Sequence, residues 1–393
     1  MKFRFLQYLL LPALLLGGVS CGNNNNPLTS SGAGLLFIAT KGDTSISAYT
    51  VNLGNGTLSL IGTAAPTLAV PSAIAITPSV NALFVADSGA NAISAYAINS
   101  DGSLAAVSGS TPTGTGTNPV AMDIDRSGRF LFVANQGSSS VSVFTINGTG
   151  LTAVPGSPFT TIPTGLSYPN GTLPSAVSVS ASGKFLYVAN QFANFVSAFS
   201  VNPSSGALTP LTIPFYNVGT GPSALNINPS GGFLYVANSG SNNISAFAIC
   251  DAVTTSCSNQ TAPDGTLTVV PNSPFPSGLS PRAIAVDPNF SFLYVVGADT
   301  VSQYSYGSGT GALTPLSPPT ISTGLAPVSI AVRAGATGTN VGNTTTNPTD
   351  YVYVANSGAG TISAYTLATA SGLLTVLGSP VPNFADPSAI AAK

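Results

Sequence analysis

Short apolar runs recur along this chain at a nearly regular spacing. Each run is built mainly from Val, Ile, Leu, Phe, Tyr and Ala, and turn-forming Gly, Ser, Asn or Asp follows closely. The seven runs are LLFIAT (35–40), ALFVAD (82–87), FLFVAN (130–135), FLYVAN (185–190 and 233–238), FLYVVG (292–297) and YVYVAN (351–356). Such segments are typical of β-strands, and a period of roughly 50 residues built from them predicts a β-propeller.

One repeat contains four such segments. In the third repeat they are VAMDID (120–125), FLFVAN (130–135), VSVFTI (141–146) and LTAVPGSPF (151–159), separated by turns rich in Gly, Ser and Asn. Four strands make one propeller blade. No stretch carries a helical period, so we predict an all-β fold with four-stranded antiparallel blades.

The first segment of each repeat has its own pattern, in which a proline is followed by alternating small and apolar residues. It recurs as PSAIAI (71–76), PVAMDI (119–124), PSAVSV (174–179), PSALNI (222–227), PRAIAV (281–286), PVSIAV (327–332) and PSAIAA (387–392). A strand with Ala or Ser on one face suits the crowded hub of a propeller. We therefore expect these segments to be the innermost strands.

The order of the segments predicts how the ring closes. Residues 35–68 supply only the second, third and fourth strands of a blade, and residues 387–392 are a first strand without partners. Pairing Ser388–Ala391 with Leu36–Ala39 would complete that blade and remove an open edge. We predict seven blades in one domain, residues 35–393, with a small core at each interface.

The N-terminal segment predicts export. Residues 1–20 combine Lys2 and Arg4 with an apolar stretch and small residues before Cys21, which is typical of a signal peptide. The sequence GVSC resembles a bacterial lipobox, so we expect lipid on Cys21; the alternative is simple cleavage with a free thiol. Residues 21–34 would then tether the domain to the bacterial cell envelope, at the outer membrane, in the periplasm or at the cell surface.

The two remaining cysteines, Cys250 and Cys257, lie close together within an insertion. In an exported protein such a pair favours a disulfide. A metal site needs more ligands, and we predict neither a metal nor a cofactor.

The composition excludes several classes of chemistry. The chain has no His, Glu or Trp, and only 5% of its residues are charged, against roughly 25% in an ordinary globular protein. Histidine-dependent triads cannot be built, and without a basic patch we expect no nucleic-acid partner. Because His and Glu are absent, we also expect stability to change little between about pH 5.5 and 7.5.

Two charged residues depart from the repeat. Arg282 stands at the start of a first strand where the other repeats have Ser or Val, and it could bind an anion at the channel mouth. Asp123 stands within a first strand where the others have Ala, Ser or Asn. They are the catalytic candidates; the alternatives are a structural Arg and an Asp bonded to nearby backbone.

Neutral polar and aromatic residues supply a second set of candidates on the same face. They could bind an uncharged ligand such as a glycan, whose rings stack on aromatic faces while amides bond its hydroxyls. The alternative for the recurrent Asn is that it satisfies backbone groups at the end of its strand. The set is Asn135, Gln136, Asn190, Gln191, Asn238, Asn356, Tyr168 and Tyr216.

The repeat FLYVAN…ISAF…GTLT…SPF…GPSA resembles the lactonase-type seven-bladed propellers, which include bacterial 6-phosphogluconolactonase, and the YVTN-repeat proteins of microbial surfaces. The resemblance implies a channel-mouth site with Arg, His and Glu; Arg282 is kept, while His and Glu are absent. We therefore expect a monomeric, non-catalytic binding or scaffold protein for a neutral ligand or protein partner, touching the membrane only through its lipid. The alternative is a lactonase-family hydrolase or cycloisomerase with a reduced site.

Overall fold

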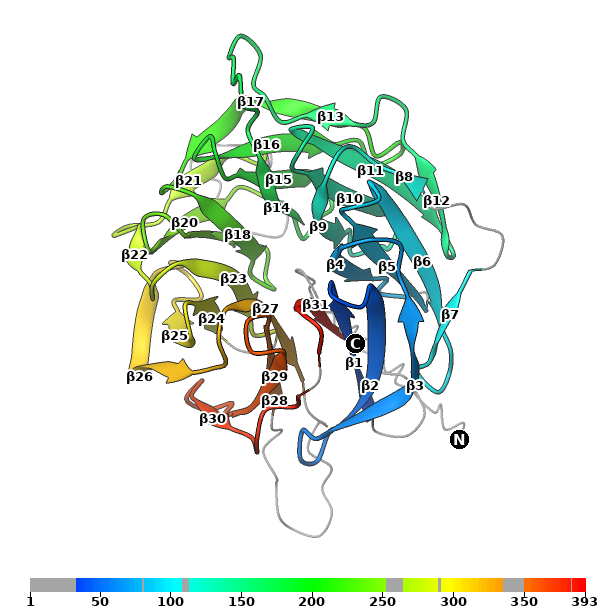
Figure 1. Ribbon diagram of the computed structural model, residues 1–393. Coiled ribbons are helices and arrows are strands. Elements are labelled where there is room, and N and C mark those ends of the chain that lie inside the picture. The colour runs from blue at the N-terminus through cyan, green and yellow to red at the C-terminus, as the bar shows by residue number, and fades with distance from the viewer. Residues whose placement is uncertain are drawn as a thin grey trace, which may run out of the picture.

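The computed structural model describes residues 33–79, 81–107, 113–251, 264–288, 291–334, 350–382 and 384–393. All regular elements in these ranges are β-strands, and they form seven antiparallel sheets placed as blades around a central axis (Figure 1). We number the seven blades in chain order, starting with the blade that contains β1. Blade 1 holds β31 and β1–β3, blade 2 β4–β8, blade 3 β9–β13, blade 4 β14–β17, blade 5 β18–β22, blade 6 β23–β26 and blade 7 β27–β30.

The two inner layers of strands match the repeated segments. The innermost strands are β4 (Pro71–Ile76), β9 (Pro119–Ile124), β14 (Pro174–Val179), β18 (Pro222–Ile227), β23 (Pro281–Val286), β27 (Pro327–Arg333) and β31 (Pro387–Ala392). The second strands are β1 (Ala33–Thr40), β5 (Ala82–Asp87), β10 (Phe130–Asn135), β15 (Phe185–Asn190), β19 (Phe233–Asn238), β24 (Phe292–Gly297) and β28 (Asp350–Asn356).

The two outer layers are less regular. The third strands are β2 (Ser45–Asn52), β6 (Ala92–Ile98), β11 (Ser140–Asn147), β16 (Phe195–Val201), β20 (Asn243–Ile249), β25 (Thr300–Tyr306) and β29 (Thr361–Leu367). The outermost are β3 (Leu58–Pro66), β7 (Leu104–Ala106), β12 (Gly150–Ala153), β17 (Leu208–Asn217), β21 (Leu267–Val269), β26 (Leu313–Ser322) and β30 (Leu374–Val376). In three blades a short extra strand also pairs with the third strand: β8 (Thr113–Gly114), β13 (Phe159–Thr160) and β22 (Phe275–Pro276).

The predicted closure of the ring is confirmed. Strand β31 pairs antiparallel with β1, with Ile390 opposite Ile38 and Ala389 opposite Ala39. In Figure 1 the red C-terminal strand lies beside the blue N-terminal one. The last residue continues the ladder, because Lys393 and Leu35 exchange two backbone hydrogen bonds of 2.9 Å.

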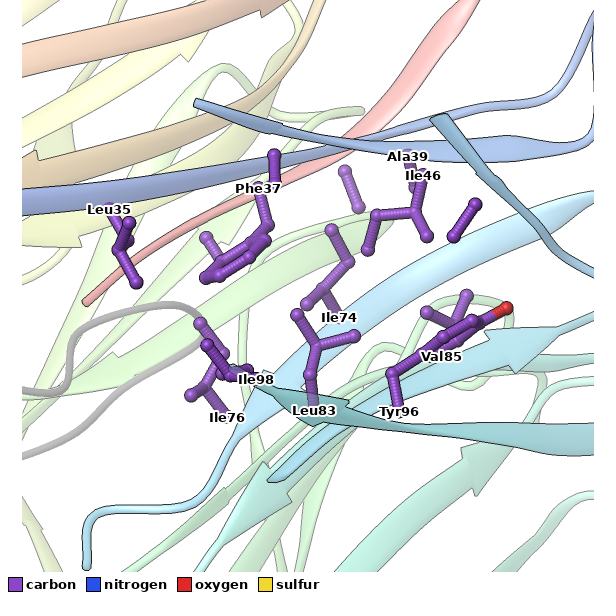
Figure 2. Close-up of a cluster of buried hydrophobic side chains, with 14 residues drawn as sticks. Leu35, Phe37, Ala39, Ile46, Ile74, Ile76, Leu83, Val85, Tyr96 and Ile98 are labelled. Carbon is purple, nitrogen blue, oxygen red and sulfur yellow. The ribbon is translucent and has the colours of Figure 1, made fainter. Parts of the chain in front are cut away.

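Each pair of neighbouring blades encloses its own apolar core, as the repeat pattern predicts. Figure 2 shows the core between blades 1 and 2, where Phe37 and Ile46 meet Ile74, Leu83 and Val85. The other six clusters likewise join residues of adjacent sheets. The closed ring therefore buries apolar surface at every junction, without one large central core.

Buried tyrosines add hydrogen bonds across four of the junctions. The third residue of the repeated second-strand run is Tyr in blades 4 to 7, and its hydroxyl donates to a glycine carbonyl in the next blade. The bonds are Tyr187–Gly265 (2.7 Å), Tyr235–Gly311 (3.0 Å), Tyr294–Gly372 (2.7 Å) and Tyr353–Gly56 (2.8 Å). Blades 1 to 3 carry Phe37, Phe84 and Phe132 at this position, so their rings contribute packing alone.

The residue before each innermost proline adopts a left-handed backbone. The φ angles are 50° at Val70, 53° at Asn118, 52° at Leu173, 63° at Gly221, 47° at Ser280, 49° at Ala326 and 54° at Asp386. In six of the seven blades the carbonyl of this residue accepts an N–H from the turn after the second strand, as in Ser88–Val70 at 3.0 Å. Left-handed conformations are unfavourable for the six of these residues that are not glycine. The hydrogen bonds help to hold this backbone conformation in place.

Candidate functional site

The hub contains a cavity of about 160 Å³ at the end where the innermost strands begin. We call it the hub cavity and number its ring positions from the proline, which is position one. Position two holds Ser72, Val120, Ser175, Ser223, Arg282, Val328 and Ser388, and all seven line the cavity. Position three is alanine in six blades and Ser329 in blade 7, and these residues line it too.

A β-bulge at position two sets the direction of these side chains. In every innermost strand the pairing register shifts next to the proline, as between Pro71 and Ala73. The four serines use this position to bridge to the following blade, each donating to a proline carbonyl there. The bonds are Ser72–Pro119 (2.7 Å), Ser175–Pro222 (2.7 Å), Ser223–Pro281 (2.6 Å) and Ser388–Pro71 (2.6 Å).

These serine bonds limit what the cavity can offer a ligand. Each hydroxyl carries one hydrogen, which is already given to a carbonyl. The four serines can accept a hydrogen bond from a ligand but have no donor left for it. Sequence reasoning missed this role, although a Ser after the proline in four of seven repeats was its signal.

Arg282 is the one charged residue among those that line the hub cavity. Its side chain is exposed at the mouth, and within the described part of the chain it makes no hydrogen bond or ion pair. Most arginines in a folded protein bond carboxylates or carbonyls, as Arg129 does with the Pro203 carbonyl at 2.9 Å. The Arg282 guanidinium therefore has N–H donors that are free to bind a ligand at the solvent-exposed mouth of the cavity.

Ser329 is the second polar group with a free donor at this site. Its Oγ accepts the Ile390 N–H at 3.2 Å, and its hydroxyl hydrogen has no acceptor among the described residues. It belongs to blade 7, the neighbour of the blade that carries Arg282. The sequence signal was its departure from the alanine of the other six repeats.

Asp123 is not brought to Arg282 and does not line the cavity. It is 2% exposed and bridges blades 3 and 4, accepting the Val179 N–H at 2.9 Å and the Ser178 hydroxyl at 3.1 Å, besides its neighbour Ile124 N–H at 2.9 Å. Burial, with a smaller contribution from nearby Asp125, raises the pKa of Asp123 to about 7, although these hydrogen bonds act to lower it. Arg282 and Asp123 therefore do not form one site: Arg282 lines the cavity, and Asp123 lies between two blades.

The four recurrent asparagines are completely buried. Each donates from Nδ2 to a serine on the third strand of its own blade. The bonds are Asn135–Ser142 (2.9 Å), Asn190–Ser197 (2.9 Å), Asn238–Ser245 (3.0 Å) and Asn356–Ser363 (2.9 Å). Their regular recurrence reflects blade construction, and we do not place them in a binding site.

The remaining neutral candidates lie away from the hub cavity. Gln136 accepts from Asn118 at 3.1 Å, and the Gln191 backbone bonds Leu173 at 2.8 Å, so both belong to turns on the mouth side. The Tyr168 ring packs on Phe195 with centroids 5.7 Å apart, and Tyr216 packs on Phe247 at 6.3 Å. None of the four lines the cavity.

The other predictions concern the cysteines, metals and membrane. Cys250 is buried and disulfide-bonded, while Cys257 and Cys21 lie outside the described residues. Over the ranges given above, no three His, Cys, Asp or Glu side chains gather as a metal site. The same ranges contain no helix long and apolar enough to cross a bilayer.

Comparison with known proteins adds family and fold. The profile of the family described as Lactonase, 7-bladed beta-propeller, matches residues 43–157 and 155–257. Solved structures of the same fold include a candidate 6-phosphogluconolactonase from Bacteroides fragilis (TM-score 0.73, 20% identity, 94% of this chain and 100% of that one). The periplasmic gluconolactonase of Pseudomonas aeruginosa is similar too (0.70, 20%, 92% and 99%). No curated protein matches the chain.

Proposed function

The chain belongs to the lactonase family of seven-bladed β-propellers, and we propose that it hydrolyses a lactone bound at the mouth of the hub cavity. The observation that carries this proposal is Arg282, an exposed guanidinium without partners among the described residues, at the rim of an otherwise uncharged hub. The lactonase names of the structural neighbours point the same way. This ranks the hydrolase above a purely non-catalytic scaffold.

The proposed reaction requires few catalytic groups. Water attacks the lactone carbonyl carbon, the ring C–O bond breaks, and a hydroxy acid forms. Negative charge develops on the carbonyl oxygen in the transition state, and a guanidinium beside that oxygen stabilises the charge more than it stabilises the neutral substrate. Arg282 would also hold the carboxylate of the product. The acceleration then comes from electrostatics and positioning, with water taking the proton.

The test is proton release measured in a pH-stat on a panel of lactones. We expect Arg282→Gln to lower kcat/KM by about 100-fold, the usual loss for one oxyanion donor. Lys41→Gln is the matched control, because Lys41 is an exposed cation whose side chain does not line the cavity. Turnover that is equal in both variants would refute the role of Arg282, and no turnover on any lactone would refute the hydrolase.

One observation favours a second candidate, a binding protein without turnover. Among the described residues that line the cavity, Arg282 is the one ionisable side chain, so no general base stands beside it. A ligand that binds tightly and emerges unchanged would establish this function.

We also propose that the protein is exported and anchored by lipid on Cys21. The support is the sequence of residues 1–21, with its basic start, apolar stretch and GVSC. In membrane fractionation we expect Cys21→Ser to move the protein from the pellet to the soluble fraction. Unchanged partition would favour simple secretion.

A further inference from the structure

The hub cavity is small for a sugar phosphate. Its volume is about 160 Å³, close to the roughly 150 Å³ of an apolar engineered cavity that binds benzene. A five- or six-membered ring with a short substituent matches this volume. A phosphorylated hexose lactone would leave most of its atoms outside.

The walls also offer few hydrogen-bond donors to the hydroxyl groups of a sugar. Apart from the position-two serines, Arg282 and Ser329, the lining residues are alanine and branched aliphatic side chains such as Ile74, Leu225 and Ile330. The serines have no donor left, because each gives its hydrogen to a proline carbonyl. A sugar hydroxyl that enters could donate to a serine Oγ, but it would find donors for its own oxygen only at Arg282 and Ser329.

Arg282 and Ser329 supply the free side-chain donors among the described residues that line the cavity. Arg282 and Ser329 belong to adjacent blades and to successive ring positions. The position-two neighbours of Arg282 in the ring are Ser223, already bonded, and Val328. One guanidinium and one hydroxyl can hold a lactone carbonyl or a carboxylate, whereas a phosphate dianion calls for several charged donors.

From this geometry we propose that the hub site takes small lactones with a hydrocarbon body, free of phosphate and of sugar hydroxyls. The inference rests on the proposed hydrolase and names its substrate class. Water adds to the acyl carbon, the acyl–oxygen bond breaks, and the ring oxygen takes one proton. The other proton is released as the carboxylate forms, so lactone plus water gives hydroxycarboxylate and H⁺.

Two measurements on the full-length protein separate the substrate class from the reaction. Calorimetric titration compares valerate, gluconate and 6-phosphogluconate, which are unreactive acids. The pH-stat compares δ-valerolactone, glucono-δ-lactone and 6-phosphogluconolactone. We expect valerate to bind at least about 10-fold tighter than gluconate, and δ-valerolactone to have the highest kcat/KM of the three.

The variants probe the two donors separately. Ser329→Ala gives blade 7 the residue that six blades already have at this position, so it should fold normally, and we expect KM for δ-valerolactone to rise about 5-fold, as for one lost hydrogen bond. Arg282→Gln should abolish valerate binding, and Lys41→Gln should leave it unchanged.

Each outcome decides one of the two proposals. A preference for glucono-δ-lactone or 6-phosphogluconolactone, with valerate bound no better than gluconate, overturns the substrate class and leaves the hydrolase standing. Valerate binding lost in Arg282→Gln, without turnover of any lactone, overturns the hydrolase and supports the ligand chemistry. Neither binding nor turnover overturns both.

Discussion

Replacing Asp123 with asparagine tests how one buried carboxyl sets the pH dependence of the ring. The pKa of Asp123 is raised from its ordinary 3.8 to about 7 in the folded protein. The folded state therefore keeps a proton that the unfolded chain loses above about pH 4, so the contribution of Asp123 to stability is fully present below about pH 4 and is lost as the pH rises through about 7. The composition alone predicted almost no change in this range, and the structure revises that expectation.

The size of the effect follows from the shift. A shift of about three pKa units corresponds to about 4 kcal/mol over the whole titration, at 1.36 kcal/mol per unit. Between about pH 5.5 and 7.5 the same linkage gives a loss of about 2 kcal/mol. For a folded ring of roughly 360 residues this is a fall in Tm of about 2–3 °C if unfolding is two-state.

The assay is calorimetric unfolding of the soluble protein at about pH 5.5, 6.5 and 7.5. Asp123→Asn should lose most of the slope, and it should be less stable at pH 5.5 by about 1–3 kcal/mol, because one amide oxygen cannot accept from both backbone N–H groups and Ser178. Asp87, whose pKa burial also raises, leaves a residual slope of the same sign. Asp101→Asn is the control, since Ser103 lowers the pKa of this exposed carboxyl. A wild-type Tm that is constant or rises over this range, or a slope that survives in Asp123→Asn, would refute the reasoning.

Three further predictions concern the ring. Tyr235→Phe removes the donor to the buried Gly311 carbonyl and should lower the free energy of unfolding in guanidinium by about 1–2 kcal/mol. Phe132→Tyr should raise the free energy of unfolding by up to about 1 kcal/mol, because it adds the equivalent bond at a junction that lacks it. Changes of the opposite sign would contradict the role of the tyrosines. Val70→Gly relieves a φ of 50° at an exposed position. It should raise the free energy of unfolding in guanidinium by about 0.5–1 kcal/mol, after subtracting the extra entropy of glycine in the unfolded chain. An unchanged free energy of unfolding would mean that the left-handed backbone at Val70 carries no strain. Deleting residues 386–393 opens the edge of β1 and unburies Ile390, which alone contributes about 2 kcal/mol; a truncated chain with the full-length Tm would show that the pairing contributes no stability.

The blades, their number and the shared closing blade were predictable because each depends on local pattern and strand order. A period-two apolar run is visible within six residues, and an unpartnered first strand at residues 387–392 implies its missing neighbours. The bonds between blades were not predictable in this way. Tyr235 and Gly311, or Ser223 and Pro281, are far apart in the sequence, and only the ring geometry brings them together.

The recurrent residues were poor indicators of the ligand site. Asn190 and its equivalents drew attention because they recur, yet recurrence in a propeller marks what every blade needs. Arg282 and Ser329 are informative for the opposite reason, since each is the one residue of its type at its position in the seven repeats. Asp123 departs from the repeat too, and it serves a junction where the cross-blade tyrosine and serine bonds are both missing, which sequence alone could not separate from a catalytic role.

The pairing of β31 with β1 sets the face from which the chain enters the ring. Strand β31 begins at the cavity mouth with Pro387 and ends on the opposite face, where Lys393 bonds Leu35. Since β1 runs antiparallel to it, the chain enters the ring from the face opposite the cavity mouth. The chain before β1 therefore joins the ring on the face opposite Arg282, and a ligand of the cavity approaches from the other side.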